Sequence, residues 1–582
     1  MRCTLAALLA IAVAAEPATA QPVVFSGVNV VTTDGRGVLE NQSVGISDGV
    51  ITAIGPAAQT AAPPGATVVD GDGRYLMPGL ADMHVHPRVA GEYISYLAHG
   101  VTTIMVLGSS NDRARQIRED RDAIERSELL GPNIITTAQI LDGSPPTGGS
   151  SALRSLESAD EAAVAVRELA EADFDVVKIY NNVPRDVFDA IVAEAATQNL
   201  PVVGHVPRNI DPAHSLANRL DVVAHAEEFF FTVFSGPRST ASIDRSWRPD
   251  AALIPGLVEA LVESDVWVIP NMAYLFSNHI MWDGLHHVWN DPEMAYLAPA
   301  TARQWRGRNL NRRDNIENFI YRDALKYALM QELVRQFAAG NVRMLLGTDA
   351  PIEATFPGKS AHRELRELVK VGLTNEQALA IGTRNAGDFA REHLGGGADA
   401  GRAANHEQFG RVSVGYRADL VLLDANPLED IRNVDDIAGV MVRGRWLDRA
   451  ALDARRAELA DGYAQFNAVA DTLRIALEEE RLETTAGALQ TRHARDEAVV
   501  AEIERVLNGL GYTFVGAGEL DQARDIFEVN TRLFPASANV WDSLAETYLA
   551  LGNRERAIEL YRKALEVDPG FESARLQLER IN

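Results

Sequence analysis

Short apolar runs alternate with helical patterns through the middle of the chain, between about residues 78 and 391. Eight such runs are bounded by polar or turn-forming residues: Leu80–His86, Val101–Leu107, Asn133–Ile140, Asp175–Tyr180, Pro201–Val206, Asp221–Ala226, Val266–Asn271 and Val342–Asp349. Strands that alternate with helices are typical of α/β folds with parallel sheets, and eight such units predict a (β/α)8 TIM barrel. A doubly wound sheet is the alternative, but it requires a glycine-rich phosphate loop for which we find no convincing candidate.

Two β-rich segments, residues 21–77 and 392–448, flank this region. They contain five β-like runs with turn signals between them: Val23–Thr33, Ser43–Ile46, Val50–Ile54, Arg411–Asp424 and Ile437–Leu447. Such runs are typical of hairpins and small antiparallel sheets. We therefore expect one composite β-sandwich, built from both segments, into which the barrel is inserted.

The tail, residues 449–582, is helical in pattern and contains an internal repeat of 34 residues. Nine positions fit the spacing of a tetratricopeptide repeat: Trp541, Leu544, Ala545, Tyr548, Gly552, Ala557, Tyr561, Ala564 and Pro569. Eight of the nine keep their character one repeat earlier, so two repeats are predicted at about residues 504–571. Because a stable array needs about three repeats, we expect neighbouring helices or the barrel to cap these two.

The first twenty residues have the pattern of a secretory signal peptide. Arg2 precedes the apolar stretch Thr4–Ala15, and the small residues Ala18-Thr19-Ala20 precede Gln21. An uncleaved anchor is the alternative. No later stretch is apolar and long enough to span a bilayer, so we expect an exported protein, periplasmic or secreted, without membrane insertion.

Charge and cysteine content narrow the possible functions. The chain has 55 Lys and Arg against 81 Asp and Glu, a net charge of −26, which disfavours nucleic acid and anionic membranes as partners. Its single cysteine, Cys3, lies inside the expected signal peptide. A cysteine nucleophile and cysteine-ligated metal sites are therefore excluded in the mature protein, and a metal site would need histidine, carboxylate or modified side chains.

Chemically active side chains gather at the ends of the predicted barrel strands. His84 and His86 lie two apart on the first strand, so both imidazoles face the same side. Four further candidates lie near the ends of later strands: Lys178, His205, His225 and Asp349. Catalytic groups of barrel enzymes collect at this face, so we interpret the group as a candidate metal site.

Lys178 stands inside an apolar strand, Val176-Val177-Lys178-Ile179-Tyr180. Burying an unpaired ammonium costs several kcal/mol, so a structural role would need a carboxylate partner such as Asp349. A neutral lysine amine can instead take up carbon dioxide and form a carbamate, whose two oxygens can bridge two divalent ions. Both readings stay open on the residues alone.

With these motifs in place, the chain resembles the metal-dependent amidohydrolase superfamily, of the binuclear type with a carboxylated lysine, near its prolidase-like and imidazolonepropionase-related branch. The resemblance covers about residues 24–448. The motifs that carry it are Leu76-Met77-Pro78-Gly79-Leu80-Ala81-Asp82-Met83-His84-Val85-His86, Gly100-Val101-Thr102-Thr103, Lys178-Ile179-Tyr180, Gly204-His205-Val206, Ala224-His225-Ala226-Glu227, Gly347-Thr348-Asp349 and Gly415-Tyr416-Arg417-Ala418-Asp419-Leu420-Val421.

The resemblance implies two divalent metal ions. His84, His86, Lys178 and Asp349 would hold one, and Lys178 as carbamate, His205 and His225 the other. Imidazole with hard oxygen ligands suits zinc, with a mixed or manganese-loaded site as the alternative. A bridging hydroxide would attack the scissile carbonyl, and Asp349 would pass its proton to the leaving nitrogen.

Substrate contacts are harder to predict. Four residues lie where such contacts are plausible: Arg88, Tyr180, Tyr274 and His362. Many relatives carry a charged or amide pair where this chain has Met105-Val106-Leu107-Gly108, which puts the transfer of specificity in doubt. The long connection at residues 272–341 is interpreted either as a lid or as helical decoration. Its arginines, among them Arg303, would either clamp a substrate carboxylate or form a solvated helix face.

The resulting hypothesis is an exported hydrolase that cleaves the C–N bond of a small-molecule substrate such as a dipeptide, an N-acyl amino acid or a cyclic amide. A lactone or ester hydrolase and a deaminase are alternatives on the same site. A non-catalytic interaction protein that works through its repeats is an alternative of another class. In either class, the repeats are candidates for a protein partner, a homo-oligomer contact or docking onto the barrel.

Overall fold

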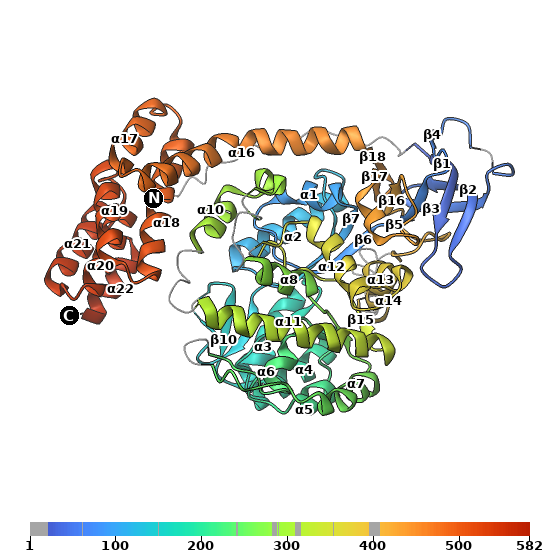
Figure 1. Cartoon of the computed structure of the whole chain (residues 1–582), viewed down its shortest axis with the longest axis horizontal. Helices are drawn as coiled ribbons and strands as arrows, with labels where there is room; N and C mark the ends of the chain where they lie inside the picture. Colours follow the sequence, from blue (N-terminus) through green and yellow to red (C-terminus); the bar gives the residue numbers. More distant parts are fainter. Residues whose placement is uncertain are drawn as a thin grey trace. The chain divides into compact units, whose positions relative to one another are not determined.

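The computed structural model describes residues 21–60, 62–148, 150–239, 243–281, 288, 290–308, 316–352, 354–394 and 408–581. The expected signal peptide, residues 1–20, lies outside the described residues. The chain forms two compact units: a barrel unit with residues 21–283 and 318–457, and a helical unit with residues 284–317 and 458–582 (Figure 1). Among the residues described, no helix is both long and apolar enough to cross a membrane.

Both β-rich segments join in one eight-stranded sheet of the barrel unit. The first segment contributes β1 (Val23–Val31), β2 (Val38–Ser47), β3 (Val50–Pro56), β4 (Thr67–Asp70) and β5 (Tyr75–Pro78), and the second contributes β16 (Leu420–Leu423), β17 (Ile437–Val442) and β18 (Arg445–Asp448). The order is β18-β17-β16-β5-β1-β2-β3, with β4 beside β1. The two segments combine as expected. They do so in one hydrogen-bonded sheet, because β5 pairs with β16 across the two segments.

The barrel strands are all parallel. They are β6 (Leu80–Val85), β7 (Val101–Val106), β8 (Asn133–Thr136), β9 (Ile140–Gly143), β11 (Val177–Ile179), β12 (Val202–Gly204), β13 (Val222–Val223), β14 (Trp267–Val268) and β15 (Arg343–Met344), with β10 (Leu153–Leu156) beside β9. The predicted third strand is divided into β8 and β9. A bridge between Val85 and Ala350 joins the last strand segment to the first, and the amide of Asp175 donates to Thr136 O at 2.9 Å. The predicted (β/α)8 architecture is confirmed.

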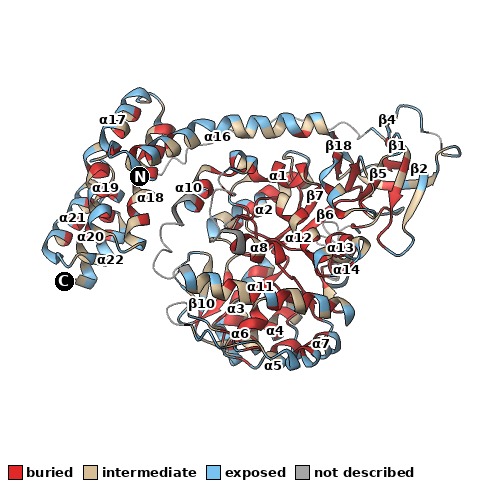
Figure 2. Ribbon diagram, in the orientation of Figure 1, coloured by how far each residue is buried: buried red, intermediate tan, exposed pale blue. Residues whose placement is uncertain are grey.

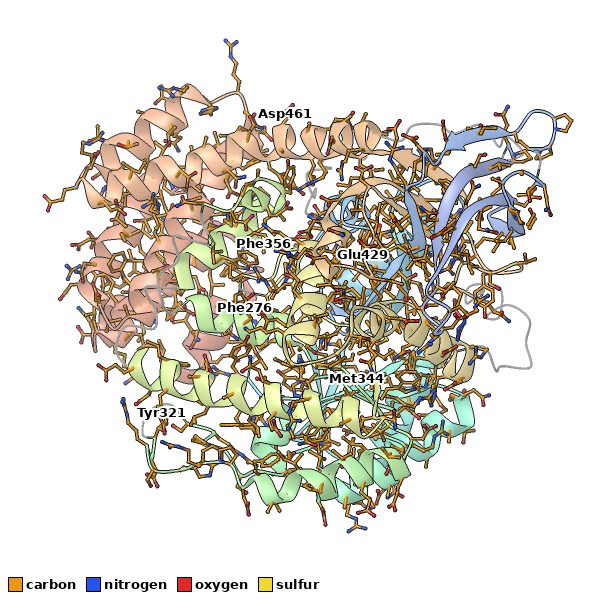
Figure 3. The ribbon with its side chains drawn as sticks, turned by 45° about the vertical axis from the view of Figure 1, so that its right-hand side comes forward. Phe276, Tyr321, Met344, Phe356, Glu429 and Asp461 are labelled. Atoms are coloured by element: carbon orange, nitrogen blue, oxygen red, sulfur yellow. The ribbon has the colours of Figure 1, made fainter. Side chains whose placement is uncertain are left out.

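Helices follow the strands around the barrel. They are α1 (Tyr93–Ala98), α2 (Asn111–Glu125), α3 (Ala159–Glu171), α4 (Arg185–Gln198), α5 (Pro212–Ala217), α6 (Glu228–Thr232), α7 (Ile254–Glu263), α8 (Met272–Met281), α11 (Ile316–Ala339), α12 (Lys359–Lys370), α13 (Asn375–Gly382) and α14 (Arg384–His393). Apolar residues from most of the strands, including Met83, Met105, Val203 and Leu345, meet in one buried cluster inside the ring. Burial is concentrated on the strands and on the inner helix faces (Figure 2). Figure 3 adds the side chains to the ribbon, and Met344 on β15 and Phe276 on α8 are among the residues labelled.

The helical unit contains the rest of the tail. Its helices are α17 (Leu482–Arg492), α18 (Glu497–Gly516), α19 (Leu520–Leu533), α20 (Ala538–Ala550), α21 (Arg554–Val567) and α22 (Glu572–Ile581), preceded by α16 (Arg449–Glu478). One apolar cluster joins α16 and α17 to α18 and α19, and a second joins α19 to α22. The helices α16 and α17 therefore cover the apolar end of the predicted repeats, which would otherwise be exposed.

Part of the connection between β14 and β15 also belongs to the helical unit. Its helix α10 (Pro299–Arg308) packs on α18, where the Arg303 guanidinium pairs with the carboxylate of Glu502. Glu502 is only 3% exposed and also accepts a hydrogen bond from Arg505 at 2.8 Å. Arg303 is therefore neither a solvated residue nor a substrate clamp, because it is used to hold α10 against α18.

Gly511 on α18 tests the packing of the helical unit. A Cβ at this position would lie 2.5 Å from ring atoms of Phe527. We expect Gly511→Ala to lower the free energy of unfolding of this unit by about 1–3 kcal/mol, because the added methyl overpacks the interface. Gly462→Ala on α16 is the matched control: with no neighbour within 4 Å, it should leave thermal unfolding unchanged or stabilise the unit slightly. Equal melting curves for both variants would contradict this packing.

Candidate metal centre

The six predicted ligands all lie at the C-terminal end of the barrel. His84 lies on β6 and His86 directly follows that strand, Lys178 is the middle residue of β11, and the other three follow β12, β13 and β15: His205, His225 and Asp349. At this face of a barrel, side chains from different strands converge on one site. Five different strands therefore contribute to one group of side chains.

His84, His86 and Asp349 form the tightest part of the group. The Nε2 atoms of the two histidines are 3.2 Å apart, and Asp349 Oδ1 lies 3.4 Å from His84 Nε2 and 3.0 Å from His86 Nε2. One ligand atom from each residue lies within 4.8 Å of the other two. Two imidazoles and one carboxylate at this spacing can bind a single divalent ion.

His225 and His205 extend the group on its other side. The rings of His84 and His225 have centroids 4.4 Å apart, and those of His225 and His205 are 4.8 Å apart. His225 Nε2 lies 3.9 Å from Asp349 Oδ2, so the two Asp349 oxygens face different histidines. Burial lowers the pKa values of His84 and His225 well below their ordinary range, which keeps both imidazoles neutral and able to bind a metal.

Lys178 is buried beside these histidines, with 1% of its surface exposed. Its Nζ makes no hydrogen bond within the described part of the chain. Burial lowers the pKa of Lys178 to about 7, although Asp349 and Glu228 act in the opposite direction. A substantial fraction of the amine is therefore neutral at neutral pH. Among the residues that the structure describes, Lys178 has no salt bridge of the kind that a structural role would require.

Backbone and side-chain acceptors fix the histidine rings. His84 Nδ1 lies 3.1 Å from Ala224 O, and His86 Nδ1 lies 3.1 Å from Gly108 O. A carbonyl accepts but never donates, so each Nδ1 carries the proton and each Nε2 presents its lone pair toward Asp349.

The His205 ring is held by two residues that the sequence reasoning missed. Its Nδ1 lies 2.7 Å from Asn181 Oδ1 and 3.1 Å from Glu228 Oε1, while its buried Nε2 has no partner among the described residues. Burial opposes ionisation of Glu228, but His205 and Arg208 overcome this effect and lower its pKa to about 2. Glu228 is therefore an ionised carboxylate that orients a candidate ligand. Nothing in its local sequence distinguishes it from Glu227.

Glu228→Gln should weaken metal binding without unfolding the protein. The amide keeps the size of the side chain but loses the charge that His205 and Arg208 share. Partners that orient a ligand from behind are worth about 10–100-fold in metal affinity, so a loss of this size is expected in a competition titration with a chelator. Unchanged metal affinity in Glu228→Gln would contradict this role.

A buried carboxylate and a glycine place Asp349. Asp82 accepts from the Thr348 amide at 3.0 Å and from its hydroxyl at 2.6 Å, and Asp349 N donates to His84 O at 2.7 Å. Gly347 passes so close to β6 that a Cβ would lie 2.9 Å from that of His84. Asp349 itself has a left-handed backbone with φ 63°, a conformation that aspartate adopts more readily than most residues other than glycine.

The donor set fits divalent metal ions. Four buried polar atoms in the group have no hydrogen-bond partner among the described residues: Lys178 Nζ, His205 Nε2, His225 Nδ1 and Asp349 Oδ1. Unsatisfied buried polar atoms are rare in folded proteins and call for a missing partner. Neutral imidazoles, a carboxylate and an uncharged amine are suited to metal ions in the absence of cysteine.

The four predicted substrate residues are placed differently. The Tyr180 ring lies 4.2 Å from that of His205, and Tyr274 lies close enough to Glu227 and Asp349 for both to raise its pKa, after burial. Arg88 is exposed, and its amide donates to Glu92 at 2.7 Å. The two nitrogens of His362 contact Asp435 at 2.7 Å and His99 O at 2.8 Å, so its ring links α12 to neighbouring elements, and its role at the substrate stays a prediction.

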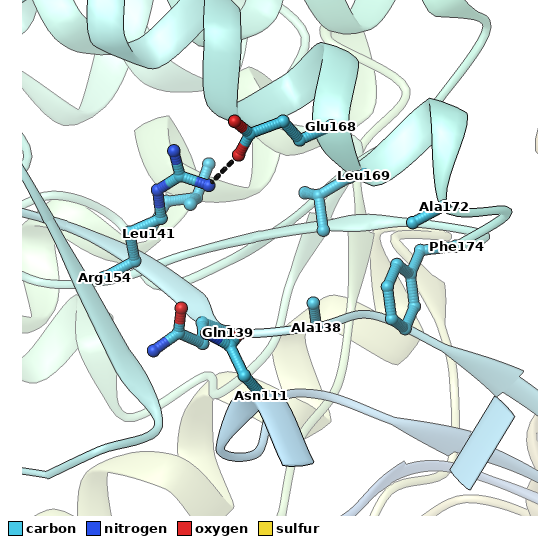
Figure 4. A pocket seen from close by; sticks show the side chains of 9 residues that line it. All are labelled: Asn111, Ala138, Gln139, Leu141, Arg154, Glu168, Leu169, Ala172 and Phe174. Carbon is cyan, nitrogen blue, oxygen red and sulfur yellow. Dashed lines mark hydrogen bonds and ion pairs between the residues drawn. The ribbon is translucent and has the colours of Figure 1, made fainter. Parts of the chain in front are cut away.

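A separate cavity of about 400 Å³ lies beside β9 and α3 (Figure 4). Its lining includes Leu141, Leu169 and Phe174, and the Arg154–Glu168 ion pair at 2.5 Å forms part of its wall. None of the six candidate ligands lines this cavity. It is therefore distinct from the metal centre.

Comparison with known proteins gives two kinds of match. A family model described as tetratricopeptide repeat matches residues 538–581. The chain is 38% identical to adenine deaminase from Paracoccus denitrificans over 99 residues, which are 16% of each protein. It is 30% identical to imidazolonepropionase from Idiomarina loihiensis over 121 residues, which are 19% of this chain and 30% of the relative. The matches thus span less than a third of either relative.

A solved structure extends the likeness over most of the chain. Bottromycin amidohydrolase aligns with a TM-score of 0.58 at 22% sequence identity, over 75% of this chain and 89% of that protein. At this level of identity the likeness concerns the fold. The chain therefore shares the fold of this amidohydrolase, is similar to an adenine deaminase and an imidazolonepropionase over limited segments, and carries a C-terminal region that matches a tetratricopeptide repeat.

Proposed function

We propose that this protein is a metal-dependent hydrolase that cleaves the C–N bond of a small amide, such as a dipeptide, an N-acyl amino acid or a cyclic amide. The observation that carries the proposal is the group of His84, His86 and Asp349 beside the buried Lys178, whose Nζ has no hydrogen-bond partner among the described residues. The amidohydrolase fold supports the reaction class, because its solved neighbour is named for amide hydrolysis.

The cofactor is proposed to be a pair of divalent ions, with zinc the expected metal. His84, His86 and Asp349 would hold one ion, His205 and His225 the other, and Lys178 would serve both as a carbamate. The carbamate forms when the neutral amine adds to carbon dioxide and releases one proton, and the pKa of about 7 favours this step. When bound, such ions activate water and polarise the substrate carbonyl.

Asp349 is proposed to act as the proton carrier. Its carboxylate lies between the first two histidines and His225, so it can take a proton at the site and donate it to the leaving nitrogen. Burial alone would raise the pKa of the Asp349 carboxyl, but His86, His225 and Lys178 together lower it below its ordinary value. Asp349 therefore starts the reaction ionised.

A substrate panel tests the reaction class. Zinc-loaded protein should release free amine from members of a panel of dipeptides, N-acyl amino acids and cyclic amides, and the rate should fall to background after chelation. Matched esters and lactones distinguish an esterase, because that activity would leave the amides intact. Hydrolysis that survives complete chelation would contradict the proposal.

Deamination is the second candidate function. The 38% identity to adenine deaminase favours it, and deamination also replaces a C–N bond with C–O. Adenine and related aminopurines therefore belong in the same panel, with ammonia as the product to be measured. Release of ammonia from an aminopurine, without cleavage of any amide, would select the deaminase.

Export and partner binding are further proposals. The pattern of residues 1–20 supports a periplasmic or secreted enzyme, which fractionation of the producing cell would test. The repeat match supports a protein partner or a contact between copies through the tail. An interaction protein without catalysis would bind its partner equally well when stripped of metal and would hydrolyse nothing in the panel.

A further inference from the structure

Arg208 lies at the edge of the candidate metal centre, three residues after His205. Its backbone amide donates to Asn181 O at 2.8 Å, and its guanidinium carbon lies 4.5 Å from the ring centroid of Phe231. The backbone bond fixes the loop and the aromatic ring supports one face of the guanidinium. Arg208 is therefore held in one orientation although 22% of its side chain remains exposed.

One edge of this guanidinium is already used. Nε donates to Glu228 Oε2 at 3.4 Å and Nη2 donates to Oε1 at 3.1 Å, and the same Oε1 lies 3.1 Å from His205 Nδ1. A guanidinium carries five N–H groups in a planar fork. The edge formed by Nη1 and the second Nη2 proton has no partner within the described part of the chain, and it is the geometry that binds a carboxylate with two parallel hydrogen bonds.

One other cation of the barrel unit, Lys326, is committed elsewhere. Lys326 on α11 is buried and pairs with Glu227 at 2.9 Å and with Asp323 at 3.5 Å. Arg208 differs from Lys326 because it is fixed, partly exposed and connected to a candidate ligand through one shared carboxylate.

We propose that Arg208 forms a carboxylate-binding subsite, which holds the free acid group of the substrate while the scissile carbonyl lies at the metal centre. This inference rests on the proposed hydrolase function and narrows it to amides that carry a carboxylate, such as N-acyl amino acids and dipeptides. The Tyr180 hydroxyl is a second donor on this side of the site, since its ring contacts that of His205 at a tilt of 43°. Arg208 binds the carboxylate of the substrate, and Glu228 links the Arg208 guanidinium to His205 at the metal centre.

Binding of two non-hydrolysable ligands tests the subsite. The acid is 4-oxo-5-phenylpentanoic acid, the ketomethylene isostere of phenylacetylglycine, and the neutral match is 1-phenylpentan-2-one, in which a methyl replaces the carboxylate. Calorimetry on the zinc-loaded full chain should show the acid binding at least about tenfold more tightly. Arg208→Met should lower the affinity for the acid by about 10–100-fold, the usual effect of losing charge-assisted hydrogen bonds. The affinity for the ketone should change less than about threefold.

Two further variants separate recognition from structure. Arg208→Lys keeps the charge without the fork and should give intermediate affinity for the acid. Arg335→Met removes an exposed arginine, with 54% of its side chain accessible, and should leave the affinities for both ligands unchanged. Metal content, measured on every variant, shows whether the loss of Arg208 disturbs His205 through Glu228.

The outcomes decide between the two proposals separately. An equal loss of affinity for the acid and the ketone in Arg208→Met, or equal affinity of the unchanged protein for both ligands, overturns the carboxylate subsite. Neither ligand contains the scissile C–N bond, so this result does not depend on turnover. Failure of every amide in the substrate panel, together with selective binding of the acid, would overturn the hydrolase and leave the subsite standing.

Discussion

Lys178→Met is expected to lower kcat/KM for amide hydrolysis by about a thousandfold, because removal of a shared ligand costs several kcal/mol of stabilisation at the reacting carbonyl. Metal content should fall from about two equivalents to about one, since His84, His86 and Asp349 remain. The protein should stay folded. Methionine fills a similar volume in the core, and a lysine whose pKa is lowered to about 7 by burial gains nothing from its charge.

Rescue by a small carboxylic acid gives this variant a second readout. Lys178→Gly leaves space where the carbamate would lie, and added propionate or bicarbonate should restore part of the activity together with the second metal ion. Circular dichroism and thermal unfolding of Lys178→Met report whether the barrel is intact. A folded Lys178→Met protein with full activity and full metal content would contradict the role of Lys178.

Asp349→Asn is expected to lower kcat by about 10²–10⁴-fold, the usual contribution of a positioned acid or base. The change keeps the size of the side chain and removes the charge that faces His84, His86 and His225. Because the loss falls on proton transfer as well as on metal binding, excess zinc should not restore the rate. Initial rates at saturating metal, over a series of zinc concentrations, measure this.

Asp112→Asn is the matched control for Asp349→Asn. Its side chain is 89% exposed on α2 and pairs with Arg115, so the same chemical change there should leave kcat unchanged. If excess zinc returned Asp349→Asn to full activity, Asp349 would be a metal ligand and not the proton carrier.

The barrel could be predicted from sequence because the pattern that marks each strand lies within a few neighbouring residues. Each strand is a short apolar run between turn signals, and its last residues necessarily lie at one face of a parallel barrel. His84, His86, Lys178, His205, His225 and Asp349 occupy such positions, so the pattern alone brought them to one end. The distances between them required the structure.

Residues that support the ligands could not be found in this way. Asn181, Glu228 and Asp82 act through contacts across the barrel, and acidic or amide residues near strand ends are too common to single out. The contacts of His362 could not be foreseen for the same reason, because α12 turns its ring toward Asp435 and His99. Side-chain direction in a helix depends on tertiary packing.

The long connection after β14 shows a further limit of sequence reasoning. Its composition allowed a lid, a decoration or an arginine clamp, but not the packing of α10 on α18 almost 200 residues later in the chain. Contacts between segments so far apart leave no periodic signal. Arg303 and Glu502 look like ordinary surface charges until the helices that carry them are placed together.

The most direct test of the proposed metal centre is a paired measurement of metal content and turnover on the same protein samples. Chelator-treated protein, titrated with zinc in the presence of bicarbonate, should regain amide hydrolysis in proportion to bound metal and reach its maximum near two equivalents per chain. Full hydrolysis by protein that contains no metal would contradict the account.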